Sequence, residues 1–182
     1  MTSQLRVDKI LPVDGAPTGG GGGIIQVVQS VKTDVSEKAN IVSSTDWTGH
    51  GLSVTITPKF STSKILITGN ITLGLAYTET VWYKLLKGGS VLTGAVGDQL
   101  GSSRARATGA TYFQGDVWAN IQLHIEYLDT AGSTSALTYT PAFSISTTTT
   151  GRTLYVNRPP SATDNANYAS YISTMTAMEV SA

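Results

Sequence analysis

Cysteine is absent from this chain of 182 residues, and charged residues make up only 13% of it. Without cysteine the protein forms no disulfide, zinc–thiolate site or thiol nucleophile. The 12 basic and 12 acidic residues balance one another and are scattered, so the sequence predicts no basic surface for nucleic acid. No apolar run approaches the roughly 20 residues of a membrane-spanning helix. We therefore expect neither nucleic-acid binding nor membrane insertion.

Histidine is also scarce, which limits the catalytic chemistry available. A serine hydrolase needs a histidine beside its nucleophile, and the two histidines, His50 and His124, lie in no recognisable motif. His50 lies between two glycines and indicates a turn, with ligand contact as the alternative. His124 alternates with Gln122 and Glu126 on the polar face of a strand, which favours a solvated face or a polar layer between subunits over a metal or base role.

The acidic residues give no stronger indication of an enzyme. Glycoside cleavage needs two carboxyl groups at a set separation in space, and no motif supports such a pair among Asp98, Asp116, Glu126 and Asp129. The first residues are polar and charged, unlike a secretory signal, so lysis or assembly into a particle is the expected route out of a cell. We expect no catalytic residue, no metal and no cofactor.

A run of five glycines divides the chain: Gly19, Gly20, Gly21, Gly22 and Gly23. Five glycines in succession support neither a helix nor a stable strand. The run is followed by β-branched residues and lacks the Gly-Lys-Ser/Thr ending of a phosphate-binding loop. It therefore predicts a hinge between an N-terminal arm, residues 1–23, and one folded domain, residues 24–182.

Most of the body shows the period-two alternation of β-strands, separated by polar turn residues. A glycine pair, Gly88–Gly89, supplies the positive φ that a tight hairpin requires. Some eight strands favour an antiparallel sandwich or barrel. The expected strands are residues 24–31, 52–57, 65–75, the two arms of a hairpin around 87–90, 117–128, 136–146, 153–157 and 171–180.

Two long connections, residues 97–116 and 158–170, are candidates for recognition loops, because binding residues on β scaffolds concentrate in loops. Their aromatic side chains suit carbohydrate stacking or protein contact, and the alternative is that they fold back and cap the ends of the sandwich. The candidate receptor-contact residues are Tyr112, Phe113, Asn165 and Tyr168.

Contacts between subunits are expected where apolar residues occupy a face that the fold does not need. Residues 24–31 are apolar on both faces, and Trp118 falls on the polar face of its predicted strand. A cysteine-free domain gains stability from association, which also covers sheet edges. The candidate contacts of a homotrimer are Ile25, Val27 and Trp118.

Four segments resemble tail-fibre and related virion proteins of tailed bacteriophages, especially those infecting cyanobacteria and other marine bacteria. The N-terminal SQLRVDKILPVDGAPTGGGGGIIQVVQ is similar to a segment that many of these proteins share. The ending SYISTMTAMEV resembles the last strand of their small β-head domains, and VWYKLLKGGSVL and LYVNRPPSATDNANYAS are similar to other strands of those heads. The resemblance covers nearly the whole chain, although no shaft repeat separates the arm from the head.

The resemblance implies a jelly-roll-like antiparallel β-sandwich head, usually trimeric, with an extended N-terminal arm fixed to the virion. It implies a non-enzymatic structural protein that is located in the virion and displayed for host recognition, with host polysaccharide or protein as the partner. The missing shaft favours a short tail fibre, and capsid or collar decoration, an adaptor, or a lectin-like module are the alternatives. The arm residues expected to bind another virion protein by strand addition or groove filling are Leu5, Arg6, Val7, Asp8, Lys9, Ile10, Leu11 and Pro12.

Overall fold

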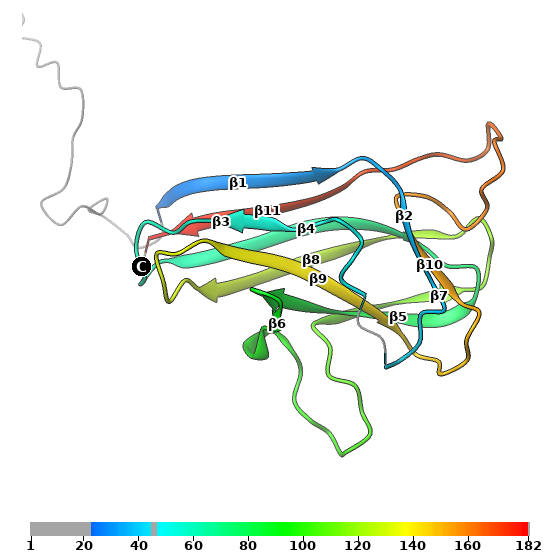
Figure 1. Ribbon diagram of the computed structural model, residues 1–182, viewed down its shortest axis with the longest axis horizontal. Helices are drawn as coiled ribbons and strands as arrows, with labels where there is room; N and C mark the ends of the chain where they lie inside the picture. The colour runs from blue at the N-terminus through cyan, green and yellow to red at the C-terminus, as the bar shows by residue number, and fades with distance from the viewer. Residues whose placement is uncertain (1–22, 45–46, 182) are drawn as a thin grey trace, which may run out of the picture.

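The fold is seen in a computed structural model, which describes residues 23–44 and 47–181. Within these ranges the protein is a sandwich of two antiparallel β-sheets, with one 3₁₀ turn at Thr93–Ala95 and no α-helix (Figure 1). The expected all-β sandwich is therefore confirmed.

The first sheet, called the β4 sheet, is organised around its longest strands. Strand β4 pairs along its whole length with β8, and its other edge pairs with β11 and, at its last residues, with β10. Strand β1 lies beyond β11, and β2 lies beyond β10. The strands are β1 (Ile24–Lys32), β2 (Ser36–Ala39), β4 (Lys64–Gly74), β8 (Asn120–Thr130), β10 (Thr153–Val156) and β11 (Ser173–Val180).

The second sheet, called the β5 sheet, covers the inner face of the first. Strand β5 pairs with β9 on one edge and with both β7 and β6 on the other, while β3 lies beyond β9. The strands are β3 (Val54–Ile56), β5 (Thr78–Lys87), β6 (Ser90–Val91), β7 (Gly109–Gln114) and β9 (Leu137–Ile145).

The core lies between the sheets and follows the alternation seen in the sequence. On β4, Ile65, Ile67 and Ile71 point inward and are fully buried, while Thr68 and Asn70 lie on the outer face. On β8, Leu123 and Ile125 point inward and His124 points outward, as the pattern predicts. The β5 sheet contributes large aromatic side chains to the same core: Tyr83, Phe113, Tyr139 and Phe143.

The long connection expected at residues 97–116 is partly wrong, because its second half forms strand β7. This strand pairs with β5 over its full length. Its alternation places Phe113 in the core at 0% exposure and leaves Tyr112 on the outside at 56%. Burial removes Phe113 from the candidate receptor contacts and agrees with the alternative that it caps the sandwich.

One further expectation about strands is revised and two are confirmed. Residues 24–31 form the expected strand, β1, at the edge of the β4 sheet beside β11. Strand β8 begins at Asn120, so Trp118 lies in the turn before it and not on the strand. The hairpin between β5 and β6 is confirmed, since Gly88 and Gly89 both have positive φ angles, 58° and 82°.

His50 lies in a turn, as expected, and its side chain is a core residue, which argues against the alternative of ligand contact. Its ring is fully buried and packs at 5.1 Å from the ring of Phe143 and 5.5 Å from that of Trp47. Nε2 lies 2.7 Å from the carbonyl oxygen of Pro141, and Nδ1 accepts a hydrogen bond from the N–H of Leu52. Burial lowers the pKa of His50, so its neutral form is the one that these contacts favour.

We predict that Phe113→Ala destabilises the protein by about 3–5 kcal/mol, because it opens a cavity between the sheets. Tyr112→Ala on the same strand is the matched control and costs less than about 1 kcal/mol, since that side chain is mostly solvated. Urea unfolding of both variants measures the difference. Equal losses would contradict the burial of Phe113 and return it to the solvent-facing candidates.

Candidate functional site

The residues expected to attach the chain to a virion lie outside the described residues. This holds for Leu5 to Pro12 and for four of the hinge glycines, Gly19 to Gly22. Gly23 is described, and its carbonyl oxygen accepts a hydrogen bond of 2.9 Å from the N–H of Ser181. The arm therefore joins the head beside the end of the last strand.

A buried carboxylate closes the sandwich at this junction. Glu179, near the end of β11, is fully buried. It accepts hydrogen bonds from the backbone N–H groups of Lys59 (2.8 and 3.0 Å) and Phe60 (3.2 Å), and from the side-chain amide of Gln26 at 2.6 Å. One carboxylate thereby holds together the first strand, the turn before β4 and the last strand.

The same contacts set the charge state of this group. Burial acts to raise the pKa of Glu179, but hydrogen bonds from Lys59, Gln26 and Phe60 to the charged form outweigh it. The pKa of Glu179 consequently lies below its ordinary value. The ionised carboxylate is the form that stabilises the junction.

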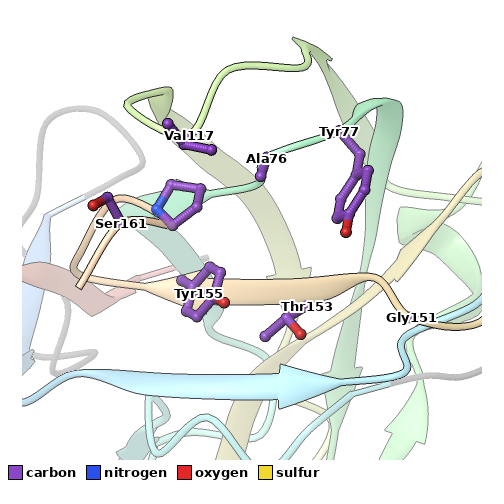
Figure 2. A pocket seen from close by; sticks show the side chains of 8 residues that line it. Ala76, Tyr77, Val117, Gly151, Thr153, Tyr155 and Ser161 are labelled. Atoms are coloured by element: carbon purple, nitrogen blue, oxygen red, sulfur yellow. The ribbon is translucent and has the colours of Figure 1, made fainter. Parts of the chain in front are cut away.

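A cavity of about 280 Å³ lies at the opposite end of the sandwich (Figure 2). The register of the β4 sheet shows the separation, because the first residue of β4 pairs with Val180 and the last pairs with Tyr155. The cavity is formed by β10, the residues before β5, the turn before β8 and the loop after β10. Its lining residues are Ala76, Tyr77, Val117, Gly151, Thr153, Tyr155, Pro160 and Ser161.

Two tyrosine rings line the cavity, and each is held by an arginine. The guanidinium carbon of Arg152 lies 4.0 Å from the ring centroid of Tyr77, and that of Arg158 lies 4.2 Å from the ring centroid of Tyr155. Each arginine is in turn paired with a carboxylate, Arg152 with Glu79 at 3.6 Å and Arg158 with Glu37 at 2.6 Å. Such stacking and pairing fix the ring positions in advance of any binding.

Asn157 anchors the loop that forms one wall of the cavity. Its side-chain amide donates to the carbonyl oxygens of Lys32 and Asp34, both at 2.9 Å, and its Oδ1 accepts from the hydroxyl of Ser173. Its own carbonyl accepts from the N–H of Tyr171 at 2.9 Å. Residues 158–170 therefore leave and rejoin the sheet at a single well-bonded point.

Gly74 lets this loop pack closely on the end of β4. A Cβ at Gly74 would lie 2.5 Å from the carbonyl oxygen of Arg158 and about 3 Å from Pro159 and Pro160. No side chain larger than hydrogen fits there without moving backbone. The glycine is thus needed for the close approach of the loop backbone to β4.

The remaining receptor candidates lie on or near this end. Tyr168 stacks on Trp118 with a centroid distance of 4.9 Å. Asn165 makes the turn that presents Tyr168, since its carbonyl accepts from the Tyr168 N–H and its side chain from the N–H of Asn167. Tyr112 is exposed on β7. None of these residues lines the cavity, and any receptor role for them stays a prediction.

The three candidate trimer contacts do not lie together. Val27 is exposed on the outer face of β1, whereas Ile25 is the residue left unpaired by a register shift in that strand. Trp118 lies at the other end of the sheet, beside Tyr168. They therefore do not form one surface on a single head.

His124 lies on the outer face of β8 as expected, with solvent around it. Its ring nitrogens lie 3.2 Å from Oδ1 of Asn70 and 3.5 Å from a carboxylate oxygen of Glu126. In residues 23–44 and 47–181, no group of three or more side chains that could hold a metal ion is found. The same ranges contain no helix long and apolar enough to cross a membrane.

Sequence reasoning missed the cavity residues, because they come from four separate segments. One local signal was available at Tyr155, an outward-facing aromatic residue between the buried Leu154 and Val156 with an arginine close on each side, at positions 152 and 158. An outward aromatic flanked in this way has no core role. Tyr77, Thr153 and Ser161 carry no comparable signal.

Comparisons with known proteins add no assignment. No protein-family model matches this chain, and no curated protein matches it closely enough to indicate common descent.

We predict that Glu179→Gln lowers the free energy of unfolding by about 1–3 kcal/mol at pH 7, because an amide cannot accept from all the N–H groups that the carboxylate serves. A pKa lowered in the folded state stabilises above the unfolded pKa, and this contribution disappears as pH falls through the folded pKa. The difference between wild type and variant should thus shrink below about pH 4.5. Urea unfolding at several pH values tests this, and a difference independent of pH would contradict it.

Proposed function

We propose that this chain is a non-enzymatic virion protein, a short tail-fibre-like appendage whose arm anchors it to the particle and whose head is displayed for host-surface recognition. The observation that carries the proposal is that the two ends of the head differ. Gly23 is bonded to Ser181 at one end of the head, and β10, which carries two residues that line the cavity, lies at the other end (Figure 1). An anchored protein that binds a surface needs its attachment and its binding site at opposite ends.

The order of the strands supports a jelly roll as the form of the sandwich. Without the short strands β2, β6 and β10, one sheet has the order β1, β11, β4, β8 and the other the order β3, β9, β5, β7. Two four-stranded sheets whose successive strands mostly cross from one sheet to the other are typical of that fold. The resemblance of the arm and the last strand to virion proteins supports the same proposal.

We also propose that the head is a homotrimer, and that the outer face of the β4 sheet mediates its assembly. An apolar row crosses this face through directly paired residues, from Val27 to Met178, then Leu66, then Leu128. Val27 and Leu128, at its two ends, are 55% and 54% exposed. A continuous apolar row on a solvated sheet face is stabilised when a second copy covers it.

Capsid or collar decoration, an adaptor role and a lectin outside any virion are the alternative functions. Decoration and an adaptor share the arm-mediated attachment and differ in where the chain lies in the particle. A lectin needs the cavity but no attachment by the arm. The location of the chain in an intact particle separates the first two from a tail fibre.

We predict that deletion of residues 1–22 abolishes incorporation into the particle and leaves the head folded, since Gly23 and the bonds of the sandwich remain. The matched control replaces Gly19 to Gly22 with serines, which keeps the length of the arm and should preserve incorporation. Immunoblots of purified particles measure incorporation, and circular dichroism measures folding. Normal incorporation of the truncated chain would contradict attachment by the arm and favour the lectin alternative.

We predict that the wild-type chain in solution has three times the 19.1 kDa mass of one chain, and that Leu128→Glu shifts it to the monomer, because a charge in the apolar row would be buried without a partner. Leu100→Glu is the matched control, as Leu100 is exposed and lies outside the row. Light scattering coupled to gel filtration measures both masses. A monomeric wild type, or a trimeric Leu128→Glu variant, would refute this interface.

A further inference from the structure

We infer that the cavity between β10 and the 158–170 loop binds an uncharged sugar residue. The inference deepens the proposed function and rests on it in one respect, that this end of the head faces a host surface. The aromatic rings, the hydroxyl groups, the neighbouring charges and the volume of the cavity support it.

The cavity offers two aromatic surfaces to a ligand. Tyr77 and Tyr155 line the cavity, and a guanidinium covers one face of each ring. The surface left for a ligand is consequently the uncovered face or the edge of a ring that cannot easily turn. A fixed aromatic surface provides contact area at little entropic cost, and the C–H-rich face of a pyranose ring is a ligand surface of that kind.

Hydroxyl groups accompany the rings. Thr153 and Ser161 line the cavity together with the two tyrosines. Among residues 23–44 and 47–181, the hydroxyl groups of Tyr77, Thr153 and Tyr155 have no hydrogen-bond partner. A purely apolar ligand would leave these groups unpaired when it displaced water, which is unfavourable. A ligand with its own hydroxyl groups satisfies them.

The carboxylates beside the cavity disfavour an anionic ligand. The two arginines stacked on the tyrosine rings each lie beside a carboxylate. Arg158 is bonded to Glu37 at 2.6 Å, whereas Nε of Arg152 lies 3.6 Å from Glu79 and makes no hydrogen bond. A phosphate or an acidic sugar would have to compete with these glutamates. The site thus favours a neutral polyhydroxylated ring.

The size of the cavity limits the ligand to a short saccharide. A volume of about 280 Å³ lies just below the range of typical ligand pockets, about 300 to 1,000 Å³. One sugar residue fills such a space, and the rest of a polysaccharide chain would extend past Val117 and Pro160 into solvent. Binding of a single residue is expected in the millimolar range, and several heads on one particle would raise the overall affinity.

Saturation-transfer NMR on the full-length protein tests the site with glucose, galactose, mannose, N-acetylglucosamine and, as the charged probe, glucuronic acid. We expect saturation of at least one uncharged sugar and weaker or no saturation of glucuronic acid. Tyr77→Ala/Tyr155→Ala should weaken binding about tenfold or more, whereas Tyr112→Ala, an exposed tyrosine outside the cavity, should leave it unchanged. Ser161→Trp, which fills the cavity and keeps both tyrosines, should abolish binding as well.

Three results would overturn the inference. They are no saturation of any uncharged sugar, saturation of glucuronic acid alone, and binding that survives both Tyr77→Ala/Tyr155→Ala and Ser161→Trp.

Adsorption of particles to host cells separates this inference from the proposed function. If wild-type protein binds a sugar and particles with the Ser161→Trp head adsorb normally, the sugar site stands and the display function fails. If no sugar binds and the same particles lose adsorption, the display function stands and the sugar ligand is refuted.

Discussion

The pairing of β4 with its neighbours is the constraint on which the rest of the head depends. β4 is bonded to β8 over its full length on one edge and to β11 and β10 on the other. Because side chains alternate between faces, this register decides that Ile65, Ile67 and Ile71 enter the core. A slip of one residue would expose that set and bury the threonines and Asn70. The same register aligns Leu66 with Met178 and Leu128 on the outer face, and it places Asn120 of β8 and Tyr155 of β10 on opposite sides of Gly74.

The two ends of the sandwich are closed by different chemistry, and this difference fits the proposed attachment at one end and the proposed recognition at the other. At the arm, the ionised carboxylate of Glu179 accepts hydrogen bonds from three segments, which makes a firm base for a chain that leaves the domain there. At the other end, Asn157 fixes the foot of the 158–170 loop, and the N–H of Ser161 donates to the carbonyl oxygen of Val117. Further along, the loop carries Tyr168, which stacks on Trp118 outside the core. Loops held on a rigid sheet are well suited to recognition.

Features set by residues close together in the sequence were predictable, whereas features set by contacts between distant strands were not. The alternation of β4 and β8 and the glycine pair of the β5–β6 hairpin are local signals, and all three were predicted. Strand β7 was missed because Gly109–Gln114 follows a long polar stretch and is a strand only through its pairing with β5. The cavity was missed for the same reason, since Tyr77, Val117 and Tyr155 meet only after both sheets have formed. The turn at His50 was predicted from its glycine neighbours, but the burial of its ring was not, because Phe143 and Trp47 reach it only in the folded sandwich.

The positions of the apolar row and the cavity on the β4 sheet allow self-association and binding to coexist. Both lie along the same sheet, because Tyr155 points outward opposite Gly74, and Leu66 lies eight residues earlier on β4. At about 3.3 Å per residue they are roughly 26 Å apart. The outer face between them is polar, with Thr68, Asn70 and His124. Copies that met at the apolar row would therefore be joined near Gly23. The polar stretch costs more to desolvate, so the cavity ends of the copies would stay apart. Under the proposed function, such an assembly would present several copies of the cavity at the end opposite Gly23.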